Sequence, residues 1–147
     1  MPSRDYLIKS ESSGILPSCY ILEDKEMEES SLYDRLLSDL ALLNIPIDEV
    51  TIEFRPYSVT YFGKYFIKNH LIAIYPYANK QGDFLNYDTI LETAIHESVH
   101  HIQHQDPNFI RRRGVMHDTQ FWKIYNHFID RAVKLNIVEE GRLKKHA

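Results

Sequence analysis

Apolar residues recur at three- and four-residue spacing in three stretches of the chain, the spacing that places side chains on one face of an α-helix. The pattern predicts helices from Ser31 to Pro46, from about Asp88 to Pro107 and from about Asp118 to Ile137. Proline cannot continue a helix, so the first two are expected to end before their prolines. Ser31 and Asp34 resemble a capping signal at the start of the first helix. Thr89 and Glu92 have the spacing of a capping box at the start of the second.

Three shorter segments are rich in aromatic and β-branched residues, which favour strands. The predicted strands are Val50–Arg55, Val59–Ile67 and Leu71–Tyr75. Gly63 is expected to mark a bulge or turn within the second strand. Asn69 and His70 are expected to turn the second and third strands into a hairpin.

The elements follow one another as a helix, three strands and two further helices, an order that predicts the α+β class. We expect a zincin-like fold, in which a small sheet of three or more strands packs on the second helix and the flanking helices. Residues 31–140 would form this single domain, followed by a basic tail over 141–147. Residues 1–30 are expected to be irregular, with Tyr6–Lys9 and Cys19–Leu22 as short strands at most.

Composition agrees with one globular domain. The chain has 147 residues, of which 44% are hydrophobic and 26% charged, enough to bury a core of its own. Its single cysteine, Cys19, excludes an internal disulfide and an all-cysteine zinc site. No apolar signal segment follows Met1, and the longest apolar run, Leu71–Ala78, is far shorter than the ~20 residues that span a membrane. We therefore expect a cytoplasmic, intracellular protein without membrane contact.

The formal net charge of −4 is unevenly distributed along the chain. Residues 108–147 carry 9 basic and 4 acidic side chains, whereas the preceding residues are acidic overall. Arg111, Arg112 and Arg113 form a continuous basic stretch. Such a stretch can contact the phosphates of DNA, or it can be a solvated face. DNA is therefore a candidate partner.

The strongest chemical signal is the sequence HESVH, residues 96–100, in the second predicted helix. His96 and His100 lie one turn apart on the same helix face, so both imidazoles can bind one Zn²⁺ at about 2.0–2.1 Å. Glu97 can accept the proton of a water held by that ion as the water attacks a carbonyl carbon. The motif predicts one catalytic zinc ion with Glu97 as the general base.

A catalytic zinc ion needs a third protein ligand. His104 continues the spacing, but its Cα lies about 12 Å along the helix axis from that of His96, too far for one ion. Asp106 stands where metzincins place their third ligand, but Gln103 replaces the glycine that turns their chain. His117 follows a loop that can fold it back toward the pair. We favour His117 over Asp106 or another carboxylate.

Two tyrosines are candidates for stabilising an oxyanion or contacting substrate. Tyr125 lies two turns into the third helix, and Tyr75 ends the strand Leu71–Tyr75, which we take as the edge of the sheet. Packing is the alternative role for each. His101 is expected to face away from the histidine pair at the surface, and His127 is expected to be packed.

Several of these motifs resemble the SprT-like zinc metallopeptidases. The resemblance covers roughly residues 31–135 and rests on Gly63, the strand Leu71–Ile74, the segment Thr89–His100 and the segment Gly114–Trp122. It implies a zincin architecture, with an active-site helix against a small sheet whose edge strand can hold a peptide substrate.

The same resemblance implies that His96, His100 and His117 bind zinc and that Glu97 is the base. Asp118 stands where the family usually has glycine, and the chain lacks the cysteines of the family's common C-terminal zinc ribbon.

These features predict a zinc-dependent metalloendopeptidase that acts on protein or peptide substrates. The alternative is a catalytically silent zincin-fold module that binds metal or nucleic acid. A module that only held metal would not need Glu97 beside the first ligand. A helical interaction protein with incidental histidines is the third hypothesis, and metal analysis distinguishes it from the other two.

Overall fold

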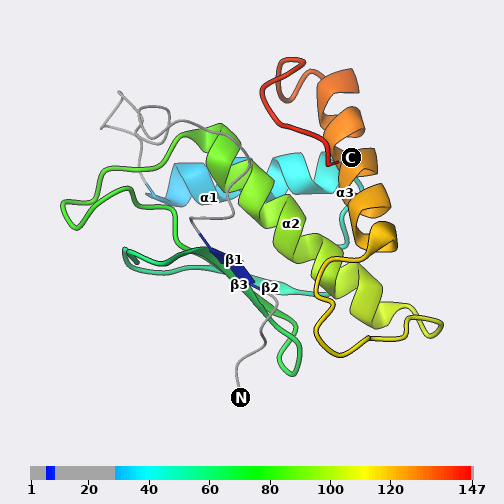
Figure 1. The fold of residues 1–147 in the computed structure, drawn as a ribbon. Helices are drawn as coiled ribbons and strands as arrows, with labels where there is room; N and C mark the ends of the chain where they lie inside the picture. The colour runs from blue at the N-terminus through cyan, green and yellow to red at the C-terminus, as the bar shows by residue number, and fades with distance from the viewer. Residues whose placement is uncertain (1–5, 9–28, 147) are drawn as a thin grey trace.

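The computed structural model describes residues 6–8 and 29–146, and within them it has the α+β architecture that the sequence predicts (Figure 1). The strand expected at Cys19–Leu22 lies outside the described residues. In chain order the elements are β1 (Tyr6–Ile8), α1 (Glu29–Leu42), β2 (Thr51–Phe54), β3 (Tyr61–Phe66), β4 (Leu71–Ile74), α2 (Tyr87–Gln105) and α3 (Thr119–Lys134).

The described strands form one mixed sheet in the order β1-β3-β4-β2. β3 and β4 are an antiparallel hairpin, as predicted, and His70 in its turn has a left-handed φ of 48°. β2 joins β4 in parallel, and β1 joins β3 antiparallel. The prediction that Leu71–Tyr75 is an edge strand is therefore wrong, because β4 lies between β3 and β2.

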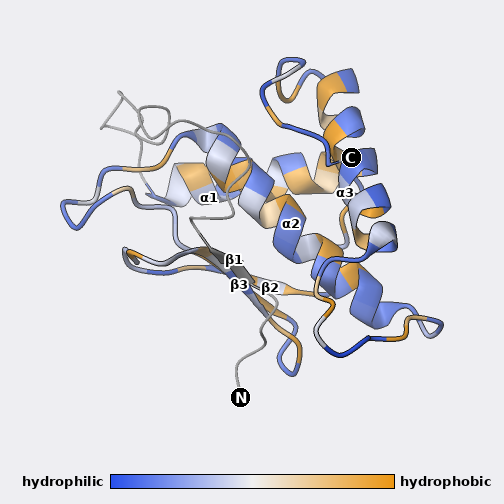
Figure 2. Cartoon of the chain, viewed as in Figure 1, coloured by the Kyte–Doolittle hydropathy of each residue, from blue (hydrophilic) through white to orange (hydrophobic). Residues whose placement is uncertain are grey.

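α2 is the central helix of the fold and packs between the sheet and the other two helices (Figure 1). Nearly every side chain from Tyr87 to His101 is buried, because different sides of α2 face the sheet, α1 and α3. α1 buries the leucine stripe Leu32, Leu36 and Leu40. Each fully buried leucine contributes roughly 1.5–3 kcal/mol relative to an exposed one. Figure 2 shows apolar and polar bands alternating along α3, which buries one side and exposes the other.

The helix starts differ from the sequence prediction. α1 begins at Glu29, so Ser31 lies inside its first turn and is not the cap. α2 begins at Tyr87, and Asn86 is its N-cap, with Oδ1 accepting a hydrogen bond from the Asp88 N–H at 2.8 Å. The predicted capping box at Thr89 is therefore wrong, because asparagine supplies the cap three residues earlier.

The helix ends are set by backbone geometry as much as by proline. α1 stops at Leu42, and Asn44 with a φ of 64° takes the left-handed conformation common at helix ends, ahead of Pro46. α2 stops at Gln105 because Asp106, which precedes Pro107, is extended. α3 ends at Lys134, short of the predicted Ile137.

The C-terminal segment packs on the helices. Leu143 is buried, and the Arg142 guanidinium pairs with the Asp88 carboxylate at 2.7 Å. The His146 ring stacks on Trp122 with 3.7 Å between centroids. The segment predicted as a basic tail, residues 141–147, therefore contacts α2 through Arg142 and α3 through His146.

Gly63 sets how closely β3 approaches α2. It lies inside β3, so the predicted alternative of a turn at Gly63 is wrong. The β1–β3 pairing has a register shift next to Gly63, close to where the bulge was predicted. Gly63 does not have a positive φ. Glycine is required there because a Cβ would collide with Thr93 Cγ2 and lie 3.3 Å from Glu97 Cγ.

Gly63→Ala is expected to destabilise the protein by about 1–3 kcal/mol, the usual cost of overpacking a well-packed contact. The free energy of unfolding in urea measures it. Thr93→Ser removes the colliding methyl group but keeps the hydroxyl, which donates to the Thr89 carbonyl at 2.7 Å. The double variant should therefore lose much less stability than the two single variants combined. Additive losses would mean that the close approach is not the reason for glycine.

Candidate metal centre

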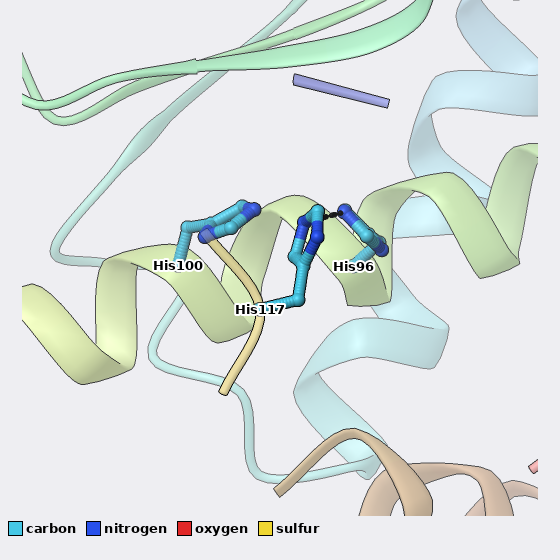
Figure 3. Close-up of side chains that lie close together, drawn as sticks. All are labelled: His96, His100 and His117. Atoms are coloured by element: carbon cyan, nitrogen blue, oxygen red, sulfur yellow. Dashed lines mark hydrogen bonds between the residues drawn. The ribbon is translucent and has the colours of Figure 1, made fainter. Parts of the chain in front are cut away.

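Three histidines meet where α2 passes the loop that leads into α3. His96 and His100 lie on α2, and His117 immediately precedes the α3 N-cap. One ring nitrogen from each histidine can be chosen so that the three nitrogens lie within 4.8 Å of one another, and the rings lie close together (Figure 3). His96 Nε2 and His117 Nε2 are 3.1 Å apart. These three side chains can therefore hold one metal ion between them.

This geometry distinguishes between the candidates for the third ligand. His117 belongs to the cluster, as the loop argument predicted. In the described part of the chain, neither Asp106 nor His104 belongs to such a group. The His104 ring stacks on Tyr65 with 6.1 Å between centroids.

Gln103 explains how the loop brings His117 back to α2. Its side chain is buried, and its amide Nε2 donates to Asp118 Oδ1 at 2.9 Å and to Gln120 Oε1 at 3.1 Å. Asp118 Oδ1 also accepts from the Phe121 N–H at 2.8 Å and so caps α3. Sequence reasoning treated Gln103 only as a missing glycine. In the structure it fixes the start of α3 and thereby the position of His117.

Aromatic side chains enclose the histidines on the α3 side. Phe121 is fully buried, and its ring centroid lies 5.0, 4.6 and 4.7 Å from those of His96, His100 and His117. Trp122 lies 5.5 Å from His117. These rings limit the rotation of the imidazoles and exclude water from this side of the cluster.

Burial keeps the two α2 histidines neutral. It lowers the pKa of His96 well below its usual value, with a further lowering by the charge of His117. Burial likewise lowers the pKa of His100, with smaller contributions from its neighbours, His96 first. Only neutral imidazole can bind a metal, so the site favours the ligand form of both side chains.

His100 also provides a direct test of whether a metal fits. Its Nε2 is buried and has no hydrogen-bond partner among the described residues. A buried polar atom without a partner costs about 1–3 kcal/mol. A metal ion among three converging imidazoles would satisfy this nitrogen, and zinc, copper, iron and nickel all accept such ligands. The residues present therefore fit a bound transition metal.

Glu97 is a buried carboxylate next to the first histidine in sequence and close to β3. It follows His96 on α2, is 0% exposed, and packs against β3 at Gly63. A Cβ on Gly63 would lie 3.3 Å from Glu97 Cγ, a tight contact, so glycine at this position lets the Glu97 side chain pack closely against β3.

The other predicted site residues are more dispersed. Tyr125 is buried on α3, with its ring centroid 6.3 Å from that of His96. Tyr75 follows β4 and packs on Tyr61 with 5.9 Å between centroids. A role in catalysis for either tyrosine stays a prediction.

The basic loop between α2 and α3 is exposed at Arg111, Arg112 and Arg113. The charge of Arg111 contributes to the lowered pKa of His100, so this arginine acts on the cluster electrostatically. DNA binding by these residues stays a prediction.

The prediction that His101 lies at the surface is wrong. It is 1% exposed, Tyr65 Oη lies 2.8 Å from its Nδ1, and Glu49 Oε1 lies 3.1 Å from its Nε2. The prediction was wrong because β3 and the loop before β2 cover a second side of α2. His127 was expected to be packed and is exposed.

Comparisons with protein-family models, with curated proteins and with solved structures found no match to this chain. None of the helices in residues 29–146 is both long and apolar enough to cross a membrane. What the protein does must therefore be derived from the chemistry of its own residues.

Proposed function

We propose that the protein is a zinc-dependent metalloendopeptidase. The observation that carries the proposal is the convergence of His96, His100 and His117 on one point, with the buried carboxylate of Glu97 directly after the first histidine. Three histidines are a ligand set of catalytic zinc sites, in which three protein ligands would hold the ion together with a water. The resemblance of these motifs to SprT-like metallopeptidases supports the same chemistry.

Bound zinc would supply Lewis acidity and lower the pKa of a water in the site toward ~7. Glu97 would accept a proton from that water while the water oxygen bonds to the carbonyl carbon of the scissile peptide. The same carboxyl would then give the proton to the amide nitrogen as the C–N bond breaks. The water is consumed, and because its second proton also passes to the leaving nitrogen, the products are a carboxylate and a protonated amine.

Metal binding without hydrolysis is the alternative function. The cluster alone would suffice for it. The position of Glu97 favours hydrolysis. Burying a carboxylate is unfavourable, and a site that only bound metal would not need a carboxylate at this position.

Protein purified without chelator is expected to contain about one zinc ion per chain, since one set of three ligands is present. Elemental analysis measures the content, and a labelled protein substrate reports hydrolysis. Chelation should abolish hydrolysis, and zinc should restore it. Chelation should also lower the melting temperature, because binding to the folded state contributes about 2.7 kcal/mol when free zinc is 100 times its Kd.

Magnesium is the control for this experiment, because it prefers oxygen ligands and should not restore either property. Absence of zinc after purification, together with no uptake on addition, would contradict the proposal.

A further inference from the structure

The edge of β3 lies beside the candidate active site. β3 pairs with β4 on one side through four residues of unbroken register. On its other side, among residues 6–8 and 29–146, it pairs only with the three residues of β1. If β1 were absent, the backbone of β3 would be an open sheet edge, which can bind any extended chain.

β1 runs past Glu97. Leu7 is the antiparallel partner of Gly63, and a Cβ on Gly63 would lie 3.3 Å from Glu97 Cγ. β1 also contacts α2, the helix that carries the histidines. Figure 1 shows β1, in dark blue, beside β3.

Over the part of the chain that the structure describes, the β1–β3 ladder is the shortest in the sheet. It spans three residues and its register shifts between Leu7 and Ile8, whereas the ladders of β4 with β2 and with β3 each pair four residues without a shift. Fewer backbone pairs must be broken to remove β1 than to remove any other described strand. An incoming peptide could replace those pairs with its own backbone groups.

We propose that β1 is an internal competitor of the extended peptide that would pair with the edge of β3. An antiparallel peptide on β3 would pass Glu97 along the path of β1, so β1 must leave before the peptide binds. The peptide's role as substrate rests on the proposed function, whereas the competition itself needs only the backbone pairing. Tethered competitors act at high effective concentration, so β1 would weaken peptide binding and keep the site closed to poor substrates.

Leu7→Pro tests the competition, because proline removes the backbone donor and disfavours the ladder. Leu7→Val is the matched control, since it keeps the amide and favours a strand. Both changes are made in the metal-loaded Glu97→Gln protein, so that the probe is not hydrolysed. The probe is a fluorescent peptide of the chain's own residues 4–10, and anisotropy measures its Kd.

The Leu7→Pro variant is expected to bind the probe with a Kd about tenfold lower than that of the parent. This value assumes that β1 leaves the β3 edge free in about a tenth of the parent molecules, which raises the apparent Kd of the parent about tenfold. Leu7→Val should bind within about twofold of the parent, because its backbone pairing is retained. Unchanged or weaker binding by a folded Leu7→Pro variant would show that β1 only completes the sheet and would overturn the inference.

Hydrogen exchange of the Glu97→Gln protein with its native β1 gives a second test that does not depend on folding of the proline variant. Saturating probe should speed exchange of the amides of Tyr6–Ile8 and leave the amides of Tyr61–Lys64 protected. Continued protection of Tyr6–Ile8 under saturation would overturn the inference. Failure of the wild type to hydrolyse any peptide, with this exchange pattern present, would instead refute the proposed function alone.

Discussion

Glu97→Gln is expected to lower the rate of peptide hydrolysis by about 10²–10⁴-fold, the usual contribution of a general base. The amide keeps the size and packing of the fully buried side chain but cannot accept the proton of the attacking water. Metal content should stay unchanged, because Glu97 is not among the converging ligands. The measurement is kcat/KM on a peptide substrate, with zinc determined in the same sample.

Glu49→Gln is the matched control for this experiment. It makes the same chemical change at a carboxylate that lies 3.1 Å from His101 Nε2, next to a cluster histidine in sequence. The glutamine oxygen can still accept that hydrogen bond, so activity should stay within about twofold of the wild type. A Glu97→Gln protein that cleaves substrate at the wild-type rate would exclude Glu97 as the base. Hydrolysis that never occurs, even in the wild type, would favour a metal-binding module.

His117→Ala is expected to weaken zinc binding by more than about 100-fold. Loss of a partner outside the ligand shell commonly costs 10–100-fold in affinity, and His117 is placed to be a ligand itself. His117 lies in the loop before α3, outside the helices, so the fold should survive the change. Competition with a chromogenic zinc chelator measures the affinity, and circular dichroism checks that the protein is folded.

Two further variants separate the alternatives for the third ligand. His104→Ala and Asp106→Ala should both retain zinc affinity, because neither side chain belongs to the cluster. Retained affinity in His117→Ala together with loss in Asp106→Ala would instead indicate a metzincin-like ligand set. His104→Ala is the closer control, since it removes an imidazole from the same helix that holds His96 and His100.

The positions of the helices and of β2, β3 and β4 could be predicted because they depend on local patterns. The leucines of α1 and the short aromatic strands carry the spacing of their elements in adjacent residues. Helix starts were less predictable. Asn86 and Thr89 can both cap a helix, and only the path of the chain after β4 decides which of them does.

Strand order could not be read from the chain. Leu71–Ile74 has no local feature that distinguishes an inner strand from an edge strand, and its parallel pairing with β2 depends on contacts between distant segments. The burial of His101 was missed for the same reason, because Tyr65 and Glu49 reach it from 36 and 52 residues away.

The sequence by itself determined that His96 and His100 lie on one face of a helix with Glu97 beside them, because an α-helix places residues four apart one turn from each other. It also singled out His117 among the residues that could complete a metal site. Only the tertiary structure decided that His117 lies within ligand distance of the pair, since Gln103 and Asp118 hold the end of the loop against α2. The tertiary structure alone also brought β1 to the edge of β3 beside Glu97. Both arrangements depend on hydrogen bonds between distant segments, which leave no periodic pattern in the sequence.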